Sequence, residues 1–168
     1  MQKNKCKRKA NFKLINKILN DEKKINFNSY KNFENRINKS RKDLKLFIDK
    51  NYPIAAYGAS TKGNIVLNYN KLRSNKISYI CDANPKKYGK YTPGSNIKII
   101  SKKKMRKLNP KFLLVLIWSF RSEIIKQEID YIKNGGSLVF HLPKLHIINK
   151  TNYKKFFNKG FRELSFKY

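Results

Sequence analysis

Residues 54–68 read IAAYGASTKGNIVLN, and this stretch decides the fold. Its apolar run ends at Gly58, four residues follow, and after Gly63 the apolar residues recur with helical spacing. This order predicts a strand, a tight loop and a helix whose N-terminal amide groups can bind an anion such as phosphate. Gly58 would allow a sharp turn out of the strand, Gly63 would let the backbone approach a ligand closely, and Lys62 adds a positive charge.

The loop does not match either of the two best-known phosphate-binding motifs. In a P-loop a Lys-Ser/Thr pair follows the second glycine, whereas here Lys62 precedes Gly63. The dinucleotide pattern GxGxxG is absent. The sequence therefore leaves two interpretations open, a phosphate or nucleotide site and glycines that serve only the geometry of the turn.

The rest of the chain alternates strand patterns with helix patterns. Strands are expected at Ile54–Tyr57, Ile77–Cys81, Ile97–Ile100, Phe112–Ile117 and Ser137–Phe140. Helices are expected at Lys62–Tyr69, Lys102–Leu108 and Arg121–Lys133. Such alternation implies right-handed crossovers and an α/β fold, a Rossmann-like parallel sheet with flanking helices.

A helical segment precedes this pattern. Helices are predicted over Phe12–Lys24 and from about Ser29 to Lys50, after a basic arm at Met1–Ala10. We divide the chain into residues 1–26, a basic arm with the remnant helix of a preceding domain, residues 27–150, the Rossmann-like domain, and residues 151–168, a basic aromatic tail.

Charge is the most unusual property of the composition. The formal net charge of the 168 residues is +30, which favours salt-sensitive, non-specific binding to polyanions. Lys, Asn and Ile together are also what AT-rich coding produces, so part of the charge can be compositional. Cys6 and Cys81 cannot form a four-ligand zinc site alone. With no signal peptide and no apolar run long enough to cross a bilayer, we expect a cytoplasmic protein that does not enter the membrane.

Candidate ligand contacts gather where the strands end, because ligands of such sheets bind beyond the carboxyl ends of the strands. Asp82 could accept hydrogen bonds from ribose hydroxyls or could instead start a turn before Pro85. The loop Lys86–Gly94 places lysines beside tyrosines, which suits a pyrophosphate and a base but also an ordinary solvated loop. Trp118 follows the most apolar strand. His141 and His146 are interpreted as structural, and the residues show no catalytic arrangement.

Four motifs in order resemble one protein family. They are YGASTKGNIVLNY, YICDANPKKYGKYTPGSNIKI, LLVLIWSFRSEI and GGSLVFHLP, which begin at residues 57, 79, 113 and 135. Together they resemble the C-terminal domain of S-adenosylmethionine-dependent sugar C-methyltransferases, which methylate carbon on nucleotide-linked deoxysugars. The resemblance extends from about Phe27 to Leu145.

The resemblance implies an enzyme in which three domains cooperate. In the family, an N-terminal zinc-binding domain and a central methyltransferase domain precede a Rossmann-like C-terminal domain that closes over the sugar nucleotide. The matching positions of this chain would form a first loop from Tyr57, Gly58, Ser60, Lys62, Gly63 and Asn64, a second wall from Asp82, Lys87, Gly89, Tyr91, Pro93 and Gly94, and a rim from Trp118 and Glu123.

The chain departs from the family's pattern before Tyr57. It has no cysteine cluster for zinc and no glycine-rich motif for S-adenosylmethionine there, and Ser119 stands where Asn is expected. We therefore expect a domain that binds a nucleotide-diphosphate sugar, is inactive alone, holds no catalytic residue, metal or cofactor of its own, and works with a separate methyltransferase domain or chain that binds S-adenosylmethionine. The alternative is a basic nucleic-acid-binding protein on a Rossmann-like scaffold.

Overall fold

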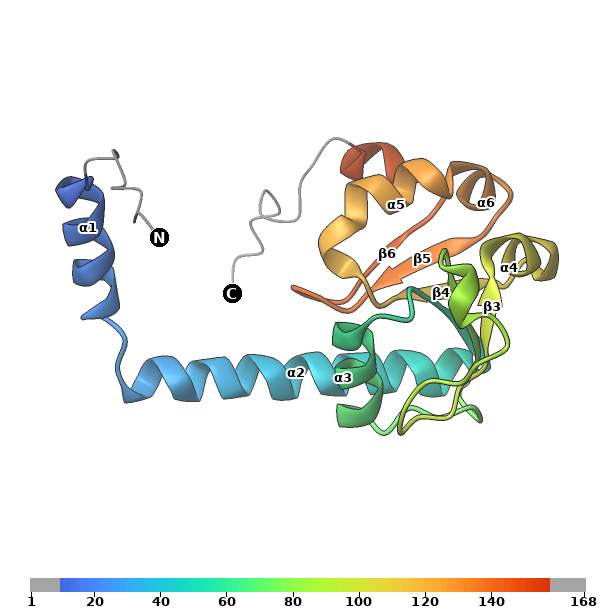
Figure 1. Ribbon diagram of the computed structural model, residues 1–168, viewed down its shortest axis with the longest axis horizontal. Coiled ribbons are helices and arrows are strands. Elements are labelled where there is room, and N and C mark those ends of the chain that lie inside the picture. Colours follow the sequence, from blue (N-terminus) through green and yellow to red (C-terminus); the bar gives the residue numbers. More distant parts are fainter. Residues whose placement is uncertain (1–9, 158–168) are drawn as a thin grey trace, which may run out of the picture. The chain divides into compact units, whose positions relative to one another are not determined.

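The computed structural model describes residues 10–157 (Figure 1). The chain divides into two units at residues 38 and 39. The first unit holds α1 (Phe12–Glu22) and the beginning of α2 (Phe27–Asn51). Asn11 caps α1, since its side chain accepts a hydrogen bond from the Leu14 amide at 3.1 Å. No residue of α1 is buried, so its apolar side chains are exposed.

The second unit is built around one six-stranded sheet of order β3-β2-β1-β4-β5-β6 (Figure 1). The strands are β1 (Ile54–Tyr57), β2 (Ile77–Asp82), β3 (Ile99–Ser101), β4 (Phe112–Val115), β5 (Ser137–Phe140) and β6 (His146–Ile148). The first five are parallel in every pairing between neighbours, which confirms the predicted Rossmann-like α/β fold with an N-terminal helical segment.

The sheet is nevertheless not wholly parallel. β6 runs antiparallel to β5, with Leu138 opposite Ile148 and Phe140 opposite His146. This strand is not among those expected from the sequence. It follows β5 after only five residues, too few for a crossover helix, so the chain can return only as an antiparallel neighbour.

Helices connect the parallel strands. They are α3 (Thr61–Tyr69), α4 (Lys102–Leu108), α5 (Arg121–Gln127) and α6 (Ile129–Lys133), with short 3-10 turns η1 (Pro85–Lys87), η2 (Trp118–Phe120) and η3 (Tyr153–Phe156). The single helix expected over Arg121–Lys133 is interrupted at Glu128, whose φ of −110° and ψ of 26° leave the helical region. The carboxylate of Glu128 is buried there, in the network described below.

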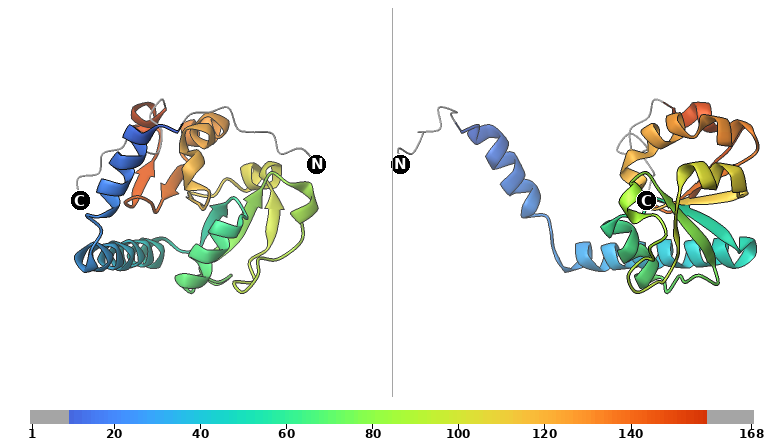
Figure 2. Two further views of the ribbon diagram at one scale, coloured as in Figure 1. Left: turned by 60° about the vertical axis from the view of Figure 1, so that its left-hand side comes forward. Right: turned by 45° about the vertical axis from the view of Figure 1, so that its right-hand side comes forward.

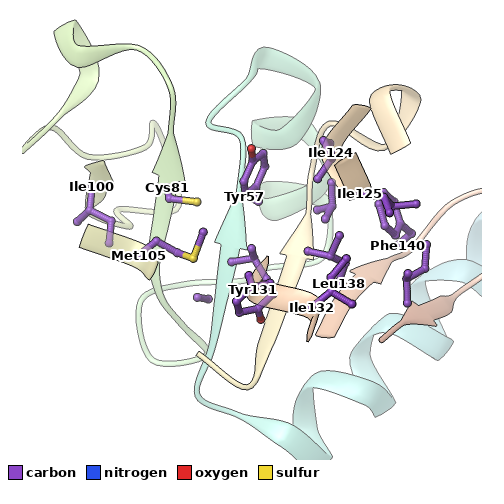
Figure 3. Close-up of a cluster of buried hydrophobic side chains, with 14 residues drawn as sticks. Tyr57, Cys81, Ile100, Met105, Ile124, Ile125, Tyr131, Ile132, Leu138 and Phe140 are labelled. Atoms are coloured by element: carbon purple, nitrogen blue, oxygen red, sulfur yellow. The ribbon is translucent and has the colours of Figure 1, made fainter. Parts of the chain in front are cut away.

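Two clusters of buried apolar side chains lie against the two faces of the sheet. Figure 2 shows the helices on either side of the sheet from two further directions. Residues of β1 belong alternately to one cluster and to the other, because successive side chains of a strand point to opposite faces. Ile54 and Ala56 belong to a cluster with Leu44 of α2 and Leu67 of α3. Tyr57 belongs to the other, with side chains from α4, α5 and α6 (Figure 3). The residues of β4 after Phe112 are fully buried, as expected of a central strand.

Some residues named from the sequence are not among the residues that the structure describes. Cys6, the basic arm up to residue 9 and the tail after residue 157 lie outside the described residues. Across residues 10–157, none of the helices combines the length and the apolar character needed to cross a membrane.

Candidate functional site

A pocket of about 360 Å³ lies where β1, β2, β3 and β4 end. The residues that line it are Tyr57, Gly58, Asp82, Ala83, Lys102, Ile117, Phe120, Glu123, Ile124 and Gln127. β1 is bordered by β2 on one side and by β4 on the other, so the order of strands reverses here. Ligands of open α/β sheets bind in the crevice at such a switch point.

Gly58 lines the pocket directly after β1. Its φ of +90° is a conformation that side chains disfavour, and an added Cβ would lie 2.8 Å from Cγ1 of Ile117. Its amide donates a 2.8 Å hydrogen bond to the carbonyl of Cys81 in β2. Glycine is therefore required at this position by both backbone geometry and space.

The loop after Gly58 leads into α3. Ser60 caps the helix, and its Oγ accepts a hydrogen bond from the Gly63 amide at 3.0 Å. Lys62 is exposed in the first turn, where the amide groups have no intrahelical acceptor. An added Cβ on Gly63 would lie 2.9 Å from Cβ of Leu116. The close approach at Gly63 thus lets α3 pack on the chain after β4. Asn64 follows in the same turn, and its carbonyl accepts from Asn68.

Asp82 joins the first loop to the second. Its Oδ2 accepts from the Ala59 amide at 2.8 Å and from Nζ of Lys87 at 3.3 Å, and its Oδ1 accepts from the Asn84 amide at 2.8 Å. Lys87 also donates to the carbonyl of Ala59 at 2.8 Å. The turn interpretation of Asp82 therefore has direct geometric support, although the residue also lines the pocket.

The remainder of the second loop folds over α3. Tyr91 pairs with Lys98 in an isolated antiparallel bridge, and Asn68 of α3 donates from Nδ2 to the carbonyl of Pro93 at 3.1 Å. Gly94 packs closely against the same Asn68 side chain. Pro93 and Gly94 therefore lie beside Asn68, near the C-terminal end of α3, and neither they nor Tyr91 line the pocket.

Phe120, and not Trp118, lines the pocket at the end of β4. The ring of Trp118 packs edge-on against His141, with 5.0 Å between ring centroids, and contributes to the core. Phe120 lines the pocket and is 56% exposed. Glu123, in the first turn of α5, also lines the pocket.

His141 is a buried residue outside the pocket. Burial, with a smaller contribution from His146, lowers the pKa of His141 to about 4, so the ring is neutral at physiological pH. Burial also lowers the pKa of His146, whose ring stacks on Phe140 at 5.2 Å. Both contacts are those of packed structural side chains.

The buried carboxylate of Glu128 is the centre of a polar network that includes the pocket-lining residues Tyr57 and Lys102. Glu128 accepts hydrogen bonds at Oε1 from the Tyr57 hydroxyl at 3.0 Å and from Nη2 of Arg106 at 2.8 Å, and at Oε2 from Nε of Arg106 at 2.9 Å. Nζ of Lys102 lies 3.5 Å from Oε1. Burial, followed by the Glu128 charge, raises the pKa of the Tyr57 phenol far above its usual value, and the hydrogen bonds to Glu128 raise that of Arg106.

The structure thus brings part of the predicted site together. Tyr57, Gly58, Asp82 and Glu123 line the pocket, whereas Ser60, Lys62, Gly63, Asn64, Lys87, Gly89, Tyr91, Pro93, Gly94 and Trp118 do not. Sequence reasoning missed Lys102, Ile117, Phe120 and Gln127. A signal for Lys102 existed, since it follows β3 directly and the rule about carboxyl ends applies to every strand. Among the residues described, no group of three or more metal-binding side chains is arranged to hold an ion.

Comparison with known proteins agrees with the motifs. NovU, a C-methyltransferase of Streptomyces niveus, is 34% identical to this chain over 96 residues, which are 57% of this chain. Those residues cover only 23% of the length of NovU, so the chain corresponds to less than a quarter of that relative. A model of the C-methyltransferase C-terminal domain matches residues 1–143. With its sheet, its motifs and this match in agreement, the chain belongs to the C-methyltransferase C-terminal domain family.

Proposed function

We propose that this chain binds a nucleotide-diphosphate sugar across the carboxyl ends of its strands and holds it for methyl transfer to a sugar carbon. The observation that carries the proposal is the pocket at the switch point of the sheet, in a chain that belongs to a C-methyltransferase domain family. S-adenosylmethionine would be bound by a separate methyltransferase domain or chain.

The groups around the pocket suit different parts of such a ligand. Outside the pocket lining, the exposed Lys62 in the first turn of α3 is suited to a phosphate through its charge. Glu123 and Gln127 are suited to sugar or ribose hydroxyls, because carboxylate and amide oxygens accept hydrogen bonds from them. The exposed ring of Phe120 offers a surface on which a base can stack.

The contribution of the chain would be positional. A reaction between two bound partners gains most when their reacting atoms are held at the correct distance and angle. Binding the nucleotide end of the substrate firmly would leave the sugar carbon facing a methyl donor supplied from elsewhere. No residue of the pocket is assigned a proton-transfer step in this proposal.

Calorimetric titration with a thymidine-diphosphate deoxysugar in near-physiological salt tests the proposal. We expect saturable one-to-one binding that Lys62→Ala weakens about tenfold, the effect of losing one charge-assisted contact. Lys133→Ala is the matched control. Lys133 is an exposed lysine in the last turn of α6, shortly before β5 begins, and the parallel strands begin at the edge of the sheet opposite the pocket. The control variant should leave the affinity unchanged.

The high net charge requires a second control. A chain of charge +30 binds polyanions without specificity, and such binding weakens steeply as salt is raised. The titration is therefore repeated with a single-stranded RNA. Absence of sugar-nucleotide binding together with tight, salt-dependent RNA binding would contradict the proposal and favour the nucleic-acid-binding alternative.

A further inference from the structure

Lys102 is the lysine among the pocket-lining residues. It directly follows β3, which is an edge strand of the sheet, and its side chain is 21% exposed. A partly buried ammonium group is normally paired, because desolvating a charge is costly. The contacts that Lys102 makes within the chain therefore decide whether it has capacity for a ligand.

Its contacts are few and mostly with neutral groups. Nζ of Lys102 donates a 2.7 Å hydrogen bond to Oε1 of Gln127 and lies 5.0 Å from the centre of the Tyr57 ring. The nearest carboxylate oxygen, Oε1 of Glu128, is 3.5 Å away, longer than a good charge-assisted bond. An ammonium group has three N–H donors, and one short bond leaves capacity for another acceptor.

Glu128 does not depend on Lys102 for its charge balance. Arg106 binds the carboxylate with two parallel hydrogen bonds of 2.9 Å and 2.8 Å, and the Tyr57 hydroxyl donates a third. Arg106 alone neutralises the single negative charge of Glu128. Lys102 therefore leaves one surplus positive charge beside the pocket.

The acidic groups of the pocket do not cancel this surplus directly. Asp82 already accepts hydrogen bonds from two backbone amides and forms an ion pair with Lys87. Glu123 is exposed, so water screens its charge. Lys102 is the partly desolvated cation among these side chains, and Gln127 fixes the position of its amino group.

The pocket also has the length for an extended ligand. Its lining residues come from the ends of four adjacent strands, from Phe120 beyond β4 to Lys102 after β3. Three spacings of about 4.8 Å between neighbouring strands give about 14 Å. This span accommodates a nucleotide laid across the sheet with an aromatic contact at one end and a cation at the other.

We propose that Lys102 is the anion-binding residue among the side chains that line this pocket, and that it contacts one phosphate of the bound nucleotide, with Gln127 as its positioning residue. The inference rests on the proposed function, since it names the residue that recognises the charged part of that ligand. It adds a second cation, inside the pocket, to Lys62, which the sequence singled out and which lies outside the pocket lining.

The test compares two lysines of one helix. Lys102→Gln and Lys103→Gln remove the same charge from neighbouring positions of α4, but Lys103 is exposed and does not line the pocket. Thymidine diphosphate is titrated into wild type and both variants, and thermal unfolding of the unliganded proteins is recorded. We expect Lys102→Gln to weaken binding tenfold or more and Lys103→Gln to leave it within twofold. Lys102→Arg, which keeps the charge, should recover most of the affinity.

The outcomes separate the two proposals. If wild type binds thymidine diphosphate and Lys102→Gln binds it equally well, the assignment of Lys102 is wrong while the proposed function stands. Equal weakening by both glutamine variants would show a long-range effect of net charge and would also overturn the assignment. If Lys102→Arg binds as weakly as Lys102→Gln, the side chain acts through packing and the assignment is again wrong. Absence of binding by wild type to both thymidine diphosphate and the deoxysugar nucleotide would overturn both proposals.

Discussion

Single residues of this chain serve two purposes, and Asp82 is the clearest example. Its carboxylate lines the pocket, yet both oxygens accept hydrogen bonds from the chain itself. Those bonds fix the loops after β1 and β2 relative to each other. Replacing Asp82 would therefore disturb the shape of the pocket as well as its chemistry, which makes Lys62 and Lys102 cleaner positions at which to test binding.

The buried ring of His141 makes stability depend on pH. Its pKa is about 4 in the folded chain and about 6.5 in the unfolded one, so only the unfolded state binds a proton between these values. The stability that the neutral ring contributes is complete above pH 6.5 and is lost as the pH falls toward 4. We expect the free energy of unfolding to fall by about 2 kcal/mol between pH 7 and pH 5 from this residue.

Urea unfolding at the two pH values measures this effect. His141→Phe keeps an aromatic ring against Trp118 and removes the titrating group, and neither ring nitrogen of His141 has a hydrogen-bond partner to lose within the described residues. The variant should show a markedly smaller fall, with the remainder due in part to His146, whose pKa is also lowered. An unchanged pH dependence in His141→Phe would contradict the assignment.

At the scale of elements, the helices differ sharply in what they bury. α1 buries no residue, whereas α2 buries Leu44 and Ile48 against the face of the sheet that carries Ile54. The long helix α2 is therefore anchored to the sheet near its C-terminal end. α3 is held through Gly63, whose missing side chain brings the helix against the chain after β4.

Two leucines of α2 test this anchoring. Leu44 is 1% exposed and Leu46 is 51% exposed, although they are two residues apart on one helix. Leu44→Ala should lower the free energy of unfolding by about 2–5 kcal/mol, because it removes buried apolar surface and leaves a cavity. Leu46→Ala should change it by less than about 0.5 kcal/mol. Denaturant unfolding of both variants gives the comparison, and similar losses would show that the helix packs differently.

At the scale of the whole molecule, the buried apolar residues are likewise unevenly distributed. The two apolar clusters that stabilise the fold draw their buried residues from Leu44 to Ile148, all within the second unit. The first unit contributes exposed apolar side chains on α1, from Phe12 to Leu19. Stability and the candidate pocket therefore both reside in the unit that begins at Lys39.

Truncation tests this division. Deleting residues 1–25 removes α1 and leaves α2 intact. Because no residue of α1 is buried, we expect the free energy of unfolding to change by less than about 0.5 kcal/mol, as for changes on an exposed surface. Thermal and denaturant unfolding of the shortened chain measure the difference. A loss above about 1.5 kcal/mol would mean that α1 supports the core.

The element pattern was predictable because it depends on local periodicity. The strand at Ile54–Tyr57 was predicted with its observed bounds, since an apolar run followed by Gly58 has few other interpretations. β6 was not, because three residues after a short connection give almost no periodic signal. The interruption at Glu128 was also missed, since a side chain that turns into the core is invisible in a helical pattern.

Three of the four sequence-predicted residues that line the pocket lie where a strand that the sequence marks strongly ends. Tyr57 and Asp82 are the last residues of β1 and β2, and Gly58 directly follows β1. Tyr91 and Pro93 were grouped with them by their loop, but a loop can fold either way from its strand, and this one packs on α3. Composition alone could not decide that direction.

The sequence by itself determined the α/β fold, the glycine turn after β1 and the family, because each depends on residues close together in the chain. Tertiary structure alone decided which side chains meet. The network of Tyr57, Lys102, Arg106 and Glu128 joins β1, α4 and the break between α5 and α6, up to 71 residues apart. Such contacts follow from how helices and strands pack in three dimensions, so no local pattern encodes them.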